Sequence, residues 1–175
     1  MWFLRLIRIQ HDYDLNRSNN GYGLQQWFAM GRPTNTQFAV AVHVLTMLGA
    51  QPDDVLSSEL MAESVGSNPV HVRRILGRLR AAALVESRPG VHGGWRLRRA
   101  RGEITLADVW RAVQGADPVL GLHGANPNCP VGQRIQRALG ALDRRAADAV
   151  ETELGTTTIC DLVTETDAAG LANTV

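Results

Sequence analysis

Nine arginines lie within 29 residues near the middle of the chain, and one acid, Glu86, accompanies them. They are Arg73, Arg74, Arg78, Arg80, Arg88, Arg96, Arg98, Arg99 and Arg101. The local charge is therefore +8, whereas the other 146 residues carry nine arginines against sixteen acids, a balance of −7. A basic block within an acidic chain is the electrostatic pattern expected of a protein that binds a nucleic-acid backbone.

A helix predicted over residues 68–82 carries four of these arginines. Asn68 is expected to cap it, with Pro69 at the first helical position, where the missing N–H costs no hydrogen bond. At about 100° per residue, one apolar face predicts contact with a core. This face consists of Val72, Ile75, Leu76, Leu79 and Ala83. The opposite face lies near the helix N-terminus and consists of Ser67, Val70, His71, Arg74 and Arg78.

The exposed face of this helix has the placement of a recognition helix, which meets base edges in the major groove. Arg73 and Arg80 project from one flank, where their forked donors suit phosphate oxygens. Gly77 costs a helix about 1 kcal/mol relative to alanine. We therefore expect another helix or a DNA strand to approach closely at Gly77. A solvated charged face on an ordinary helix is the alternative.

The element before this helix favours the DNA-binding interpretation. A shorter helix is expected to begin at Ser57 or Ser58, either of which can cap it, and to end at Gly66. Residues 66–68 then form the tight turn of a helix-turn-helix. An earlier amphipathic helix is expected from Thr34 onward.

A glycine-tipped hairpin is predicted over residues 84–98, directly after the arginine helix. Glycines such as Gly93 allow the backbone to approach a phosphate or a narrow minor groove, which Arg88 or His92 could enter. We interpret this hairpin as a wing, and a plain surface hairpin is the alternative. The predicted DNA contacts are Ser57, Ser67, Asn68, Pro69, His71, Arg73, Arg74, Arg78, Arg80, Arg88, His92, Gly93 and Arg96.

A long helix is predicted to begin at Pro130, with apolar residues stepping by three or four. The stripe consists of Val131, Ile135, Leu139, Leu142, Ala146, Val150 and Leu154. It offers more apolar surface than a small wing domain can cover, so a second copy of the chain is the simplest partner. Packing against the first helix is the alternative, and both can hold at once.

Cys129 precedes the long helix and is expected as its N-cap residue, with its sulfur near the positive end of the helix dipole. That placement favours a reactive thiolate, so redox sensing is one hypothesis and simple packing is the other. Cys160 follows Ile159 in a short apolar stretch and is expected in the core. Two distant cysteines are too few for a disulfide framework and lack the spacing of a zinc site.

Composition limits the remaining classes of function. The 175 residues are 45% hydrophobic, which is enough for one core with an appended oligomerisation element. No run approaches the about 18 apolar residues of a membrane span, and no secretory signal is present, so we expect no membrane association and a cytoplasmic location. His123 and Cys129 could be imagined as a base and a nucleophile. No oxyanion donor accompanies them, so we expect no enzyme.

The first 33 residues look foreign to the rest of the chain. Six of the nine aromatic residues precede Met30, without helical or strand periodicity. We expect a disordered or non-native extension, with Met30 as the natural beginning. An arm that grasps DNA or a partner is the alternative.

The segments from about Thr36 to Val163 resemble, in order and spacing, the Rrf2 family of bacterial winged-helix transcription regulators. They are FAVAVHVLTML, SSELMAESVGSNPVHVRRIL, LRAAALVESRPGVHGGWRL, ITLADVWRAVQG and PNCPVGQRIQRAL. The resemblance implies a homodimer that binds a palindromic operator. It also implies a C-terminal half with a sensor loop and a long dimerisation helix.

The chain departs from cluster-binding members of this family, which hold three closely spaced cysteines in the sensor loop. Residues 116–128 contain no cysteine, and Cys129 stands alone at the end of the loop. A cluster held by Cys129, His123 and a partner-chain residue is conceivable, but we expect no cofactor. The NPNCPVG segment resembles instead the cluster-free, YwnA-like branch. The signal is then an oxidant, a small molecule or none.

Together these features predict an α+β, mostly α fold: a winged helix-turn-helix domain with a long C-terminal dimerisation helix. The expected boundaries are 1–33 for the extension, 34–115 for the DNA-binding domain, 116–129 for the sensor-type loop, 130–166 for the dimerisation helices and 167–175 for the tail. The expected function is a homodimeric, DNA-binding transcriptional regulator that acts as a repressor. A winged-helix protein-interaction module is the alternative, which the +8 block argues against.

Overall fold

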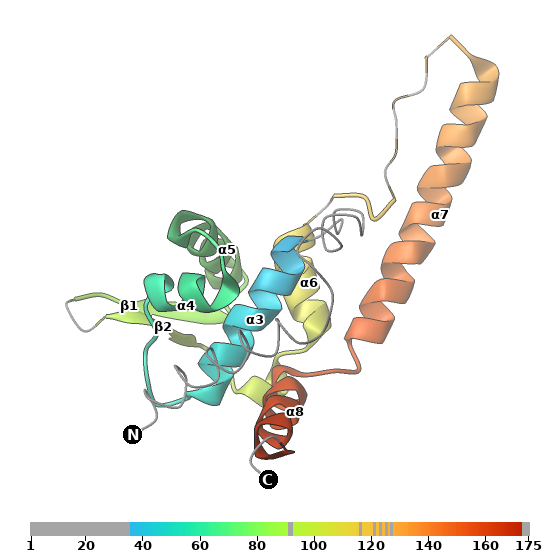
Figure 1. Cartoon of the computed structure of the whole chain (residues 1–175). Helices are drawn as coiled ribbons and strands as arrows, with labels where there is room; N and C mark the ends of the chain where they lie inside the picture. Colours follow the sequence, from blue (N-terminus) through green and yellow to red (C-terminus); the bar gives the residue numbers. More distant parts are fainter. Residues whose placement is uncertain are drawn as a thin grey trace, which may run out of the picture. The chain divides into compact units, whose positions relative to one another are not determined.

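The computed structural model describes residues 36–90, 93–115, 117–120, 122, 124, 126 and 128–172. Figure 1 shows the elements in chain order. They are α3 (Thr36–Ala50), α4 (Ser58–Val65), α5 (Pro69–Ala81), β1 (Val85–Arg88), β2 (Gly94–Leu97), η1 (Arg101–Glu103), α6 (Leu106–Gln114), α7 (Pro130–Leu154) and α8 (Ile159–Ala172). The extension expected at 1–33 lies outside the described residues. Most of the tail expected at 167–175 is helical, because α8 continues to Ala172.

Local hydrogen bonds define the two helices of the helix-turn-helix. Of the two possible caps of α4, Ser57 is the one used, and its hydroxyl accepts the amide N–H of Leu60 at 3.2 Å. Gly66 ends α4 with φ 66°, a left-handed conformation that glycine adopts without steric cost. Asn68 caps α5 as predicted, and its side chain accepts the amide N–H of Val70 at 2.8 Å.

The hairpin after α5 is an antiparallel pair in which Val85 faces Leu97 and Arg88 faces Gly94. Leu56, just before α4, adds a further bridge to Trp95 through backbone hydrogen bonds of 2.9 and 3.0 Å. A Cβ added to Gly94 would lie 2.8 Å from the carbonyl oxygen of Leu56, so this close approach requires glycine. The hairpin is thereby fixed to the start of the helix-turn-helix.

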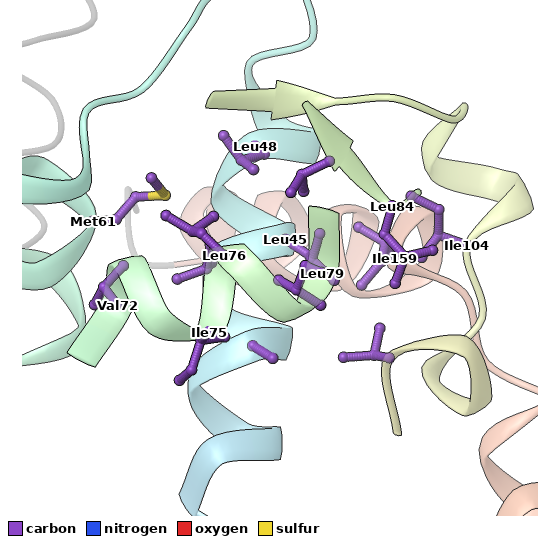
Figure 2. Packing of buried hydrophobic residues seen from close by; sticks show 14 of the residues in the cluster. Leu45, Leu48, Met61, Val72, Ile75, Leu76, Leu79, Leu84, Ile104 and Ile159 are labelled. Carbon is purple, nitrogen blue, oxygen red and sulfur yellow. The ribbon is translucent and has the colours of Figure 1, made fainter. Parts of the chain in front are cut away.

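The core face predicted for α5 is confirmed for its four helical members. Val72, Ile75, Leu76 and Leu79 are at most 1% exposed and point into the buried cluster in Figure 2. Ala83, predicted on the same face, lies beyond the helix end with φ 58° and is half-buried.

Helix α8 completes the core against α3. Its Ile159 and Val163 are buried, and a Cβ added to Gly49 of α3 would lie 3.1 Å from Ile159. Cys160 is half-buried, so the expectation that it is a core residue was wrong. On a helix, neighbouring positions point about 100° apart, which turns Cys160 away from the face that buries Ile159.

Helix α7 has no buried residue among its 25. Val131, Ile135 and Leu142 are 63%, 47% and 43% exposed. It is tied to the rest of the chain by an ion pair of 2.7 Å between Arg111 of α6 and Glu151. The predicted stripe is thus largely uncovered by the residues that the structure describes. None of the helices in the described part of the chain is long and apolar enough to cross a membrane.

Candidate nucleic-acid interface

The nine arginines of the basic block separate into groups when their partners are considered. Three are paired with carboxylates: Arg73 with Glu59 at 2.7 Å, Arg96 with Glu86 at 2.5 Å, and Arg99 with Asp108 at 3.4 Å. All three arginine side chains are at least 40% exposed. Such surface pairs add little to stability, but they balance the positive charge locally.

The Arg73 pair connects the two helices of the helix-turn-helix. Arg73 of α5 also donates to the Ser58 hydroxyl at 3.3 Å, next to Glu59 in the first turn of α4. The pKa of Glu59 is lowered, first by a hydrogen bond with its own backbone N–H, then by the Ser58 hydroxyl and Arg73. Glu59 therefore remains a carboxylate partner of Arg73 at neutral pH.

Three further arginines are held by uncharged groups. Arg101 donates to the Gly49 carbonyl at 3.0 Å. Arg78 donates to the Gln37 side chain at 2.5 Å and to the Val113 carbonyl at 2.9 Å. The guanidinium of Arg80 lies 5.9 Å from the centroid of the Trp95 ring, a cation–π contact between α5 and β2. Arg78 and Arg80, both predicted DNA contacts, thus have intramolecular partners.

Arg74, Arg88 and Arg98 remain. All three are exposed, and their side chains form no hydrogen bond or ion pair with the residues that the structure describes. Arg74 lies in the first half of α5, Arg88 ends β1, and Arg98 follows β2. Their charges are the ones available to a ligand, and they come from the second helix and the hairpin.

The N-terminal end of α5 presents a mixed surface beside Arg74. Val70 is 57% exposed, and Asn68 is exposed while Ser67, Pro69 and His71 are half-buried. An exposed valine and an arginine on adjacent turns can meet a thymine methyl group and a guanine edge, respectively. The predicted contact set leaves out Val70, because an apolar residue carries no charge signal in the sequence.

The remaining predicted DNA contacts lie outside the N-terminal end of α5. Ser57 is exposed and caps α4, and His92 lies outside the described residues. Gly93 shapes the turn of the hairpin, because an added Cβ would overlap the carbonyl oxygen of Arg88. A Cβ added to Gly77 would meet no heavy atom within 4 Å, so no described helix makes the close approach expected there.

Cys129 is placed as predicted, at the N-cap of α7. It is exposed, and its sulfur accepts the amide N–H of Gly132 at 3.4 Å. This position satisfies one of the unpaired donors at the helix N-terminus. Cys160 lies on a different helix, α8.

The comparisons with known proteins agree with this geometry. A family model described as Rrf2, an iron-dependent transcriptional regulator, matches residues 34–165. YwnA of Bacillus subtilis, named as an HTH-type transcriptional regulator, is 38% identical over 130 residues, which make up 74% of this chain and 96% of YwnA. NsrR of Streptomyces coelicolor, named as an HTH-type transcriptional repressor, is 32% identical over 113 residues, covering 63% of this chain and 73% of NsrR. A crystal structure described as a DNA-binding protein is 38% identical, with a TM-score of 0.59, and covers 73% of this chain and 98% of that one.

The two cysteines of the chain are fewer than the usual cysteine ligands of an iron–sulfur cluster. Such clusters are held mainly by cysteine thiolates, typically four, and this chain has two cysteines on different helices. Among the described residues, no three His, Cys, Asp or Glu side chains are grouped so that they could hold a metal ion. His123, the other conceivable ligand, lies outside the described residues. The absence of a cofactor remains a prediction.

Proposed function

The chain belongs to the Rrf2 family of DNA-binding transcriptional regulators, and from this premise we propose that it is a homodimeric repressor that reads a palindromic operator. The observation that carries the proposal is the unpaired Arg74 beside the exposed Val70 at the N-terminal end of α5. In helix-turn-helix proteins this end of the second helix contacts base edges in the major groove. The proposal includes a cytoplasmic location, where a bacterial regulator meets its operator.

In this proposal, the exposed residues of α5 and of the hairpin each have a role in binding DNA. Arg74 donates in a bidentate manner to a guanine, and Val70 contacts a thymine methyl group. Ser67, Asn68, Pro69 and His71 line the approach of this helix end. Arg88 and Arg98 bind phosphates or enter the minor groove on the side of the wing. Arg73 and Arg96, already paired with acids, contribute less.

The homodimer is supported by α7, whose exposed apolar residues need a cover that the described part of the chain does not provide. Two copies related by a two-fold axis present two recognition helices to a two-fold symmetric site. Repression is supported by NsrR, named as a repressor, with which the chain shares 32% identity over 113 residues. A bound dimer blocks access to the DNA that it covers.

Selection of bound sequences from random DNA tests this proposal directly. We expect an inverted repeat with half-sites about 10 base pairs apart, or a multiple of that. Binding should weaken steeply with salt, because each phosphate contact releases counterions. A protein-interaction module would enrich no sequence and would show little salt dependence.

Gly77 offers a test of how closely the DNA approaches α5. Gly77→Ala should stabilise the fold by about 1 kcal/mol, because the added methyl group has open space and alanine favours helix. If a DNA strand passes over Gly77, operator affinity should fall about fivefold despite the higher stability. Thermal melting and operator titration measure the two effects. An increase in stability with unchanged affinity would show that DNA does not approach this position.

Cys129 is the proposed element of redox response. Peroxide or hypochlorite should change the operator affinity of the native protein several-fold, because either oxidises the exposed Cys129 thiolate at the start of α7 to a larger and polar sulfenic acid. Cys129→Ser should bind DNA normally and lose this response, and Cys160→Ser serves as the matched control that keeps it. Native protein indifferent to peroxide, to hypochlorite and to diamide with an added thiol would leave Cys129 with only its role as the cap of α7, and would point to a small-molecule signal or none.

A further inference from the structure

Arg78 lies one helical turn after Arg74, yet its guanidinium is held by two other helices. Its Nη1 donates to the Gln37 Oε1 of α3 at 2.5 Å and to the carbonyl oxygen of Val113 in α6 at 2.9 Å. These partners are 41 and 35 residues away in the sequence. One side chain of the recognition helix thus joins the first turn of α3 and the last turn of α6.

The Val113 carbonyl needs such a donor because it lies at the end of α6. The last carbonyls of a helix lack partners within the helix. The amide N–H of Asp117, which would continue the pattern, bonds to the Gln114 carbonyl at 3.3 Å instead. A guanidinium also interacts favourably with the negative end of the helix dipole. Arg78 therefore acts as a C-terminal cap supplied from another helix.

The same corner of the fold contains a second link between α3 and α6. The rings of Phe38 and Trp110 meet edge to face with centroids 5.4 Å apart. Phe38 follows Gln37 in the chain, and Trp110 lies one turn before Val113. The ring pair fixes α3 against α6, and Arg78 attaches α5 to both.

We infer that Arg78 is a positioning residue for DNA binding and not a DNA contact. It fixes α5 against the ends of α3 and α6 and thereby sets where Arg74 is presented. A bidentate contact to a base depends strongly on donor distance and angle, so a small shift of α5 weakens it. The inference rests on the proposed role of α5 as the recognition helix.

The test compares variants that remove the link from either side. Gln37→Leu removes an acceptor without altering α5, and Arg78→Met removes the donors while keeping an unbranched side chain. We expect Gln37→Leu to lower operator affinity about threefold and Arg78→Met up to about tenfold, because Arg78→Met also removes the bond to the Val113 carbonyl. The double variant should bind no more weakly than Arg78→Met alone, because the Gln37 bond is already lost in that variant. The dependence of affinity on salt should stay as in the native protein.

Two further variants separate positioning from general structural damage and from phosphate contact. Gln37→Glu keeps the acceptor oxygen and should retain operator affinity within about twofold. Arg88→Met removes an unpaired arginine and should reduce the slope of log affinity against log salt by about 0.9. All titrations are made at a temperature at which circular dichroism shows every variant folded.

The inference is overturned if Gln37→Leu leaves operator affinity unchanged, or if Arg78→Met lowers the salt slope as Arg88→Met does. The first result would show that the Gln37 bond does not set the position of α5, and the second would make Arg78 a phosphate contact. Failure of the proposed function gives a different result: Arg74→Ala would then leave operator affinity intact, whatever Gln37 and Arg78 do. The two hypotheses can therefore fail separately.

Discussion

Replacing Arg74 with alanine should weaken operator binding about 5- to 150-fold, which corresponds to about 1 to 3 kcal/mol. Arg74 is exposed, and its side chain has no hydrogen-bond or ion-pair partner among the described residues, so its donors are available to a base. Folding should change little, because surface substitutions away from caps and core are usually within about 0.5 kcal/mol. Titration of operator and random DNA, together with thermal melting, measures both effects.

Arg73 provides the matched control for this variant. It is adjacent in the chain, carries the same group and is also exposed, but Glu59 and Ser58 already bind it. Arg73→Ala should therefore change operator affinity by less than about threefold, equally on operator and random DNA. Equal loss on both DNAs for Arg74→Ala would reassign Arg74 to the phosphate backbone. A large, operator-specific loss for Arg73→Ala would show that its pair with Glu59 opens on DNA.

The comparison of these two arginines shows what charge counting in the sequence can establish. The +8 block predicts a region that binds DNA, but six of its nine arginines have partners within the chain. Arg78 meets a residue 41 positions away, and Arg73 meets one 14 positions away. Long arginine side chains can reach several elements from one backbone position. Which arginines remain available to DNA therefore depends on tertiary packing.

Local signals predicted the second helix well. Asn68 and Pro69 fixed the start of α5, because capping depends on residues adjacent in the chain. The 3.6-residue period gave its core face from Val72 to Leu79. Ala83 departed from this pattern because the helix ends two residues earlier and the chain turns into β1 through a left-handed residue.

The two cysteines show the same difference between features that adjacent residues predict and features that depend on tertiary packing. Cys129 was predicted at the N-cap because Pro130 follows it, which is local information. Cys160 was expected in the core because its neighbours are apolar, but Ile159 and Val163 are the buried ones, beside Gly49 of α3. An apolar stretch does not show which of its residues is buried when the helix face is not known. For Val70 the helix face was known, and its exposure agrees with its predicted place opposite the core face of α5.

The largest structural effect is expected from charges placed in the exposed stripe of α7. Ile135 and Leu142 are seven residues apart and so share a face, and they are 47% and 43% exposed in the single chain. Replacing both with glutamate should leave the protomer folded. If the stripe forms the dimer interface, the same substitutions would bury unpaired carboxylates there and weaken dimerisation by several kcal/mol. We expect monomers at micromolar concentration by sedimentation.

These monomers should also lose operator binding, because a single recognition helix makes half of the contacts and the affinity gained from two linked half-sites disappears. Gln136→Glu, which adds a carboxylate to an exposed position of α7 about 100° from Ile135, is the control and should stay dimeric. If the double variant remains dimeric, the dimer interface does not include Ile135 and Leu142. Monomers that bind the operator as tightly as the native protein would contradict the two-fold mode of recognition, and the unpaired Arg74 of one α5 would then have to account for the whole affinity.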